Sequence, residues 1–202
     1  MLCDQFLYRI IIPMKCPIMI LLLLFCFSGV SQKACFSDCS KLFSSPRAAH
    51  PDSTLNDLKG CTAPEIRALR IDDFAFDSKD LDGKIVVINF WYAACKPCVA
   101  EIPGLNRLAE EFKNQNVVFL AFGRDDPPAI LEFLKQRPFL FQHIPKAQPW
   151  ADKFCVVLGW PTNLIIDQKG RVVFAASGGR TDEKAPDAIY HRMAPVIQRL
   201  LK

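Results

Sequence analysis

Two cysteines separated by two residues, Cys95 and Cys98, constrain the fold more than any other feature of this sequence. The run Lys84–Trp91 before them is almost continuously apolar, as expected of a central strand that is covered on both faces. The segment Val99–Lys113 after them carries apolar residues at helical spacing. The cysteine pair therefore stands where a buried strand passes into a helix, an arrangement typical of an α/β fold.

Strands and helices alternate along the rest of the chain. Apolar runs and turn residues predict strands at 66–71, 73–76, 84–91, 116–122, 140–144, 162–167 and 171–175. Helical spacing and helix-start residues predict helices at 99–113, from about 125, at 149–154 and at 182–201. This order predicts a central mixed sheet with helices on both faces.

The N-terminus has the pattern of a secretory signal peptide. Lys15 is followed by the short apolar run Ile18–Phe27 and by small residues, with Gly29 and Ser31 before the expected cleavage point. We therefore expect a signal peptide at 1–31, an irregular lead-in at 32–60 and one folded domain at 61–202. An uncleaved membrane anchor is the alternative, although the run is shorter than the ~20 residues of a spanning helix. Met14 is an alternative start.

Cysteine number and net charge narrow the class of protein. Of the nine cysteines, six remain after residue 31, an even number that would allow full pairing in an oxidising compartment. Lys and Arg number 25 against 21 Asp and Glu, a net charge of +4. This bias is too weak to indicate a nucleic-acid partner, and none is expected.

The start of a helix is a favourable position for a reactive dithiol. The free N–H groups and the dipole of the helix favour a thiolate at Cys95, and Lys96 adds a positive charge. Pro97 fits the first helical turn because its missing N–H is not needed there. Half of a zinc site is the alternative, but no second pair of ligands with suitable spacing follows, so no metal is expected.

Two segments resemble a known family. Residues 89–103, with the Cys-Lys-Pro-Cys motif, resemble the active-site segment of the TlpA/ResA-like thiol-disulfide oxidoreductases of the thioredoxin superfamily. Trp160-Pro161-Thr162, with Asp167–Arg171 after the next strand, resembles the proline loop and hairpin of that family. The resemblance implies a thioredoxin-like three-layer α/β sandwich, with an N-terminal β-hairpin and an inserted strand-helix element.

The resemblance also implies roles for these residues. Cys95 is expected to attack a client disulfide, and Cys98 to resolve the mixed disulfide. Glu101 is expected to exchange a proton with Cys98; the alternative is a solvated carboxylate in the first helical turn. Trp160, Pro161 and Thr162 are expected to bind the client, with Pro161 in the cis form.

The resulting functional hypothesis is an extracytoplasmic, periplasmic enzyme that reduces disulfides in client proteins. A membrane thiol donor would supply electrons, no cofactor is needed, and a monomer is expected. We expect the enzyme to reduce disulfides rather than form them. Lys96 is expected to be exposed, so it stabilises the Cys95 thiolate only weakly. A negative charge on Glu101 would disfavour a second thiolate at Cys98 and so favour the disulfide form of the enzyme. One alternative is a peroxiredoxin-like antioxidant enzyme, although the Pro and Thr expected before its reactive cysteine are replaced here by Ile88 and Tyr92. The other alternative is a thioredoxin-like metal-binding chaperone module.

The remaining four cysteines are candidates for structural bridges. We expect Cys35 to pair with Cys39 and Cys61 with Cys155, which would tie the hairpin to the core. Four cysteines allow three connectivities, and free thiols are also an alternative.

Overall fold

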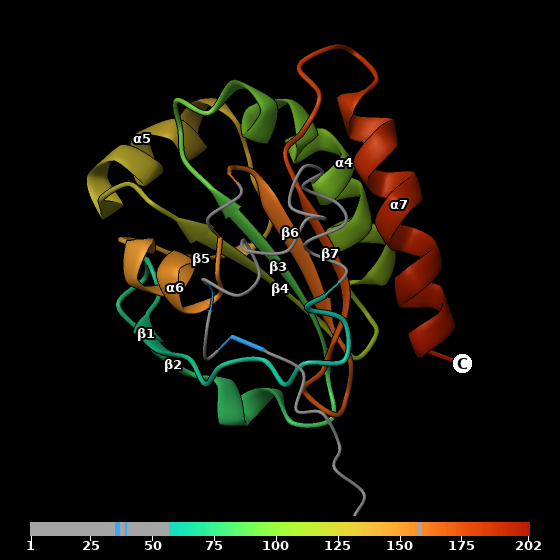
Figure 1. Cartoon of the computed structure of the whole chain (residues 1–202). Coiled ribbons are helices and arrows are strands. Elements are labelled where there is room, and N and C mark those ends of the chain that lie inside the picture. Colours follow the sequence, from blue (N-terminus) through green and yellow to red (C-terminus); the bar gives the residue numbers. More distant parts are fainter. Residues whose placement is uncertain (1–34, 37–38, 40–56, 157–158) are drawn as a thin grey trace, which may run out of the picture. The chain divides into compact units, whose positions relative to one another are not determined.

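A five-stranded sheet flanked by helices dominates the computed structural model, which describes residues 35–36, 39, 57–156 and 159–202 (Figure 1). These residues belong to one unit, Ala34–Lys202. The predicted signal peptide, and the predicted lead-in except for residues 35–36, 39 and 57–60, lie outside the described residues. Within the described ranges, no helix has the length and apolar character needed to cross a membrane.

The elements follow the predicted order. The strands are β1 (Arg67–Leu69), β2 (Ala75–Asp77), β3 (Ile85–Trp91), β4 (Val117–Gly123), β5 (Gln142–Ile144), β6 (Thr162–Ile166) and β7 (Val172–Ser177). The helices are α4 (Lys96–Phe112), α5 (Pro127–Gln136), α6 (Gln148–Lys153) and α7 (Ala185–Leu200), with a 3-10 turn, η3 (Ser78–Leu81). Helix α4 begins three residues earlier than predicted, because Cys95 caps it and Pro97 fits its first turn.

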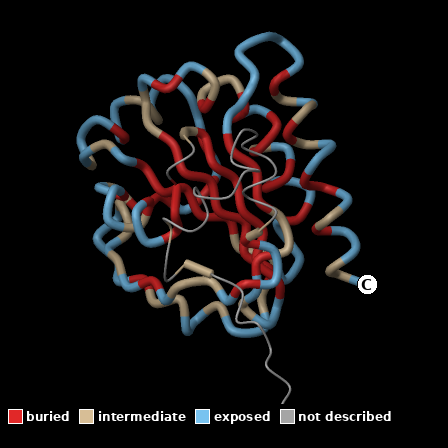
Figure 2. Tube along the Cα trace, in the orientation of Figure 1, coloured by how far each residue is buried: buried red, intermediate tan, exposed pale blue. Residues whose placement is uncertain are grey.

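The main sheet is mixed, as predicted. Its strand order is β5-β4-β3-β6-β7, with β3 parallel to β4 and antiparallel to β6. β1 and β2 form a separate hairpin, the predicted N-terminal one. β5 and α6 lie between α5 and β6 in the chain and correspond to the predicted inserted element. β3 is central, and all seven of its residues are buried (Figure 2).

The alternating side chains of β3 divide the core into two layers. Val86, Ile88 and Phe90 pack with residues of the β1–β2 hairpin and of α6. Ile85, Val87 and Trp91 pack with α4, α7 and Ile130 of α5. The sheet is thus covered on both faces, and the end of β3 delivers the chain to the start of α4.

Helices α4 and α7 touch at a glycine. A Cβ at Gly104 would lie 2.1 Å from the carbonyl oxygen of Pro186, so only glycine permits this approach. Gly104 lies further along α4 than the cysteine pair, so the close contact fixes the position of the helix that carries the pair at its N-terminus.

Two disulfides attach the start of the described chain to the core. Cys35 pairs with Cys61, and Cys39 pairs with Cys155. The expected pairing of Cys35 with Cys39 and of Cys61 with Cys155 is therefore wrong. The ring centroid of Phe36 lies 5.5 Å from that of Phe154, the residue before Cys155, so this ring contact lies beside the Cys39–Cys155 disulfide.

Candidate functional site

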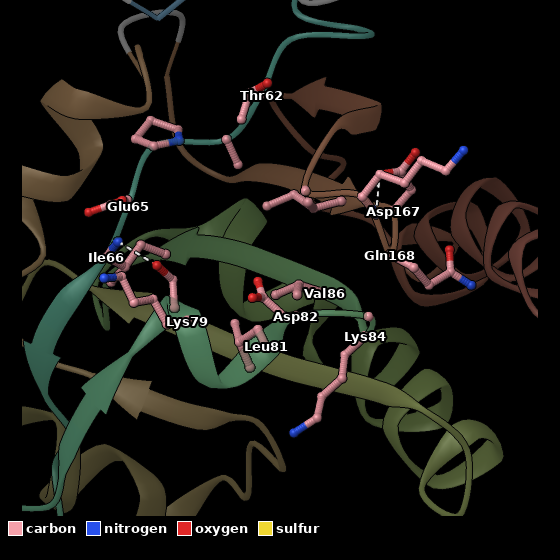
Figure 3. A pocket seen from close by; sticks show the side chains of 17 residues that line it. Thr62, Glu65, Ile66, Lys79, Leu81, Asp82, Lys84, Val86, Asp167 and Gln168 are labelled. Atoms are coloured by element: carbon pink, nitrogen blue, oxygen red, sulfur yellow. Dashed lines mark hydrogen bonds between the residues drawn. The ribbon is translucent and has the colours of Figure 1, made fainter.

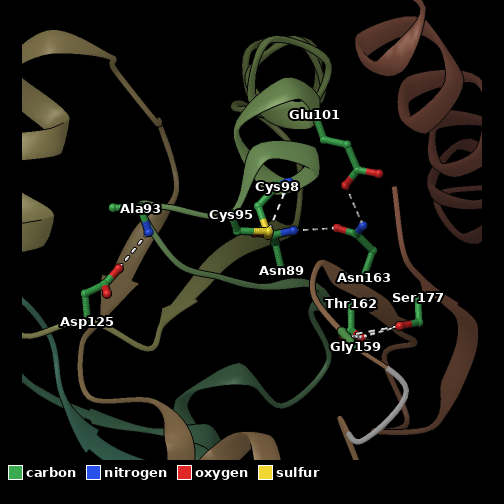
Figure 4. Close-up of a disulfide and its surroundings, with 10 residues drawn as sticks. All are labelled: Asn89, Ala93, Cys95, Cys98, Glu101, Asp125, Gly159, Thr162, Asn163 and Ser177. Carbon is green, nitrogen blue, oxygen red and sulfur yellow. Dashed lines mark hydrogen bonds between the residues drawn. A yellow bond between two sulfur atoms is a disulfide. The ribbon is translucent and has the colours of Figure 1, made fainter. Parts of the chain in front are cut away.

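The cysteine pair lies at the N-terminus of α4 and forms a disulfide (Figure 4). Cys95 is the N-cap residue, and its sulfur accepts a hydrogen bond from the backbone N–H of Cys98 at 3.3 Å. Cys95 is 3% exposed and Cys98 1%. In the reduced protein, the same N–H and the dipole of the 17-residue helix would stabilise a thiolate on Cys95.

The loop between β3 and α4 is held from a neighbouring segment. The backbone N–H of Cys95 donates to the carbonyl of Tyr92 at 3.1 Å. The N–H of Ala93 donates to the carboxylate of Asp125 at 2.6 Å. The sequence suggested Asp125 only as part of a helix start, whereas Asp126 is the N-cap of α5. Asp125 thus fixes the cysteine loop, a role that no local pattern indicated.

The proline loop has the predicted cis peptide bond between Trp160 and Pro161. The hydroxyls of Thr162 and Ser177 lie 2.8 and 3.2 Å from the carbonyl oxygen of Gly159, and these bonds hold the loop. Thr162 is 2% exposed, so its side chain supports the loop from inside. Half-buried Trp160 packs edge-on against Tyr92, with 5.8 Å between ring centroids.

Glu101 is buried one turn beyond Cys98, with only 4% of its surface exposed. The alternative of a solvated carboxylate is therefore wrong. Burial raises the pKa of Glu101 to about 7, although a hydrogen bond from Asn163 and the charge of Arg192 act in the opposite direction. The raised pKa brings the titration of the carboxyl close to neutral pH, so its negative charge is less favoured there than expected from the sequence.

Two asparagines connect Glu101 to the centre of the sheet (Figure 4). Asn89 of β3 lies opposite Asn163 of β6 and donates its amide N–H to the Asn163 oxygen at 2.8 Å. The Asn163 amide nitrogen then donates to the Glu101 carboxylate at 3.0 Å. Sequence reasoning missed Asn163. The signal was a polar residue in each of two apolar strands, but their pairing was not visible before the strands were placed.

Gly179 brings the Glu101 carboxyl and the proline loop to one place. A Cβ at residue 179 would lie 2.8 Å from a Glu101 oxygen and 3.1 Å from the ring of Pro161. The Glu101 carboxyl and the Pro161 ring therefore both lie close to the backbone of Gly179. The predicted proton carrier and the predicted client-binding proline lie on the same side of α4.

A cavity of about 550 Å³ lies away from this chemistry (Figure 3). It is formed by residues 62–66 before the hairpin, by residues around η3, and by the turn between β6 and β7. These segments surround the beginning of β3, whereas the dithiol follows its end. This cavity is therefore at the other end of β3 from the cysteine pair.

Comparison with known proteins supports the resemblance seen in the sequence. The chain is 33% identical over 132 residues to thiol-disulfide oxidoreductase ResA of Bacillus cereus, a match that covers 62% of this chain and 73% of that protein. It is 32% identical over 134 residues to the ResA of Geobacillus kaustophilus, covering 66% and 70%. The predicted relationship to ResA-like proteins is therefore confirmed.

Solved structures confirm the thioredoxin-like fold. A putative thiol:disulfide interchange protein DsbE from Chlorobium tepidum superposes with a TM-score of 0.63 at 24% identity, covering 71% of this chain and 98% of that one. A secreted Mycobacterium tuberculosis disulfide oxidoreductase gives 0.53 at 23% identity, covering 64% and 95%. Residues 59–175, more than half of the sequence, match the AhpC/TSA family, and the chain belongs to that family.

Proposed function

We propose that this protein is an extracytoplasmic thiol-disulfide oxidoreductase that reduces disulfides in client proteins. The observation that carries the proposal is the position of Cys95 as the N-cap of α4, with its sulfur bonded both to Cys98 and to the Cys98 N–H. A thiolate in that position is a good attacking group, and its sulfur is within reach of Cys98, which can then close the disulfide.

The proposed reaction moves two electrons in two exchanges. The Cys95 thiolate attacks one sulfur of the client disulfide, a mixed disulfide forms, and the other client sulfur leaves as a thiolate. The Cys98 thiolate then attacks Cys95, which releases the second client thiolate and closes the Cys95–Cys98 disulfide. The client is reduced and the enzyme is oxidised, so a dithiol donor must reduce the enzyme before the next turn.

Glu101 is the proposed proton carrier for the second exchange. Cys98 is 1% exposed, so its thiol can lose a proton only to a nearby group. The pKa of Glu101 is raised by burial to about 7, which allows its carboxyl to accept or give a proton near neutral pH. Trp160, Pro161 and Thr162 are proposed to hold the client strand beside the dithiol.

The setting of the enzyme is also a proposal. The two further disulfides and the apolar N-terminal run support an oxidising compartment outside the cytoplasm, with residues 1–31 as a signal peptide, 32–60 as a lead-in and 61–202 as the folded domain. A membrane thiol protein is the proposed electron donor, and the working form is proposed to be a monomer.

The decisive experiment measures reduction of a disulfide-containing test protein by the reduced enzyme. Cys95→Ser should abolish reduction, whereas Cys98→Ser should accumulate a mixed disulfide through Cys95. Capture of clients through Cys98 instead would reverse the assigned roles. A redox titration against glutathione tests the direction, because a potential as high as about −120 mV would indicate a disulfide donor rather than a reductase.

The two alternatives have less support. A metal-binding module built on Cys35 and Cys39 would need free thiolates, but both sulfurs belong to separate disulfides. Among the described residues, no group of three or more metal-ligating side chains comes together. A peroxiredoxin-like enzyme is expected to have Pro and Thr at fixed positions before its reactive cysteine. In this chain Ile88 and Tyr92 occupy those positions before Cys95.

A further inference from the structure

A cavity of about 350 Å³ is lined by Ala94 and Lys96, the residues before and after Cys95 in the chain. Residues of the cysteine loop and the first turn of α4 form one wall, and Arg137 after α5 and Thr181 after β7 form another. Its charged lining consists of Lys96 and Arg137, and none of its described lining residues is acidic. A group that enters this cavity next to Cys95 therefore meets positive charge.

Neither cation is neutralised by the described part of the chain. Lys96 and Arg137 are both exposed, and neither makes an ion pair with any described carboxylate. Arg180, by contrast, pairs with Asp182, next to Thr181 in the chain. The positive charge beside the dithiol is thus available to a bound molecule.

A third cation lies on the side of the proline loop. The guanidinium of Arg124 lies 3.9 Å from the ring centroid of Tyr92 and 5.8 Å from that of Trp160. Stacking on these rings holds the guanidinium in one place but leaves its N–H groups able to bind an anion. Tyr92 belongs to the cysteine loop and Trp160 to the proline loop, so Arg124 stands where the two loops meet.

Fewer carboxylates than cations lie in these segments. Asp125 accepts the Ala93 N–H at 2.6 Å and keeps its negative charge, whereas Asp126 pairs with Lys146 at 3.4 Å. Glu101 is buried and bonded to Asn163. Lys96, Arg124 and Arg137 therefore outnumber the carboxylates of Asp125 and exposed Glu183, neither of which is ion-paired within the described residues.

We propose that the enzyme prefers client disulfides flanked by acidic residues, which this cationic rim of Lys96, Arg124 and Arg137 would bind. The inference rests on the proposed function and adds the class of client. A carboxylate beside the client cysteine would lie against the rim while the cysteine sulfur meets Cys95. Opposite charges speed encounter and fix register, whereas a basic client segment would be repelled.

The test compares three disulfide-closed peptides that differ only in the residues flanking one cysteine: Glu, Gln or Lys. At low salt, the reduced enzyme should react with the Glu peptide about threefold to tenfold faster than with the Gln peptide, and slowest with the Lys peptide. The Glu-to-Gln rate ratio should fall towards one in about 0.5 M salt.

Two variants of equal charge locate the effect. Lys96→Gln with Arg137→Gln should remove most of the Glu-to-Gln ratio, even though the Lys96 change also alters Cys95 and therefore every absolute rate. Lys84→Gln with Lys169→Gln, at the other end of β3, removes the same charge and should leave the ratio unchanged.

Four results would overturn the inference. A wild-type ratio of one, with the Gln peptide still reduced, would remove the preference and leave the proposed function standing. A preference that survives in the Lys96/Arg137 variant would show that the two cations of the cavity do not carry it. A preference that disappears equally in the Lys84/Lys169 variant would assign it to the charge of the whole molecule. Reduction of none of the peptides would overturn the proposed function and the inference together.

Discussion

Replacing Glu101 with glutamine should make the oxidised protein more stable than the wild type at alkaline pH. In acid, the gain in stability over the wild type should be much smaller. The side chain of Glu101 is buried, and Asn163 donates a hydrogen bond to it. A glutamine oxygen can accept the same bond without a charge. The substitution therefore removes the cost of burying a carboxylate and keeps the shape of the site.

The magnitude follows from the raised pKa of Glu101, which burial moves from 4.5 to about 7. Below pH 4.5 the carboxyl is protonated in both the folded and the unfolded chain, and it adds no pH dependence. Between 4.5 and about 7 only the folded chain keeps the proton, so stability falls as the pH rises. Each pH unit corresponds to 1.36 kcal/mol, which gives a total loss of about 3 kcal/mol above that range.

Urea unfolding of the oxidised wild type and of the Glu101→Gln variant, from pH 4.5 to about pH 8, measures this loss. The quantity to compare is the difference between their free energies of unfolding at each pH, because the contributions of the other titrating groups cancel in that difference. The free energy of unfolding of the variant should gain about 3 kcal/mol relative to the wild type across the range. Glu110→Gln is a matched control, because Glu110 is an exposed residue of the same helix, paired with Lys113 at 2.9 Å. If the difference in free energy of unfolding between Glu101→Gln and the wild type changes with pH no more than it does for Glu110→Gln, the burial argument is refuted.

Three other substitutions test separate parts of the structure. Asn163→Leu should raise the pKa of Glu101 further, seen as an upward shift of the pH range in which stability falls, because it removes the bond that favours the carboxylate. It should also cost about 1–3 kcal/mol in urea unfolding, because Asn89 loses its buried acceptor. Gly104→Ala should lower stability by roughly 1–3 kcal/mol in thermal unfolding, since its Cβ would meet a backbone oxygen of α7 at 2.1 Å. Cys39→Ser with Cys155→Ser should cost about 2–4 kcal/mol, and mass mapping of the non-reduced wild type should recover that pair.

Local patterns predicted the parts of this fold that depend on local physics. The apolar run before Cys95 predicted the buried central strand β3, and helical spacing predicted α4, because burial and amphipathic periodicity leave a record in neighbouring residues. The cis bond at Pro161 was expected from the resemblance of Trp160-Pro161-Thr162 to the proline loop of the family, and it is confirmed.

Features that depend on distant segments were not predictable in the same way. Glu101 is buried because other segments cover it, among them residue 179. Asn163 reaches Glu101 only because β6 pairs with β3, and Asp125 reaches the cysteine loop only because β4 lies beside β3. The disulfide partners were assigned wrongly because the packing of the segment around Cys35 and Cys39 on the core, where Phe36 contacts Phe154, was not visible in the sequence.

The crossed connectivity of the two outer disulfides has a consequence for how the protein matures. Under the proposed export, cysteines that paired in the order in which they reach the outer compartment would join Cys35 to Cys39, but the folded chain joins Cys39 to a partner 116 residues further on. Native pairing therefore requires residues up to Cys155 to have emerged, and any early Cys35–Cys39 bond to be exchanged. An enzyme proposed to work as a reductant thus depends on oxidation and reshuffling to be made. Cells that lack an isomerase in that compartment should accumulate it with mispaired sulfurs.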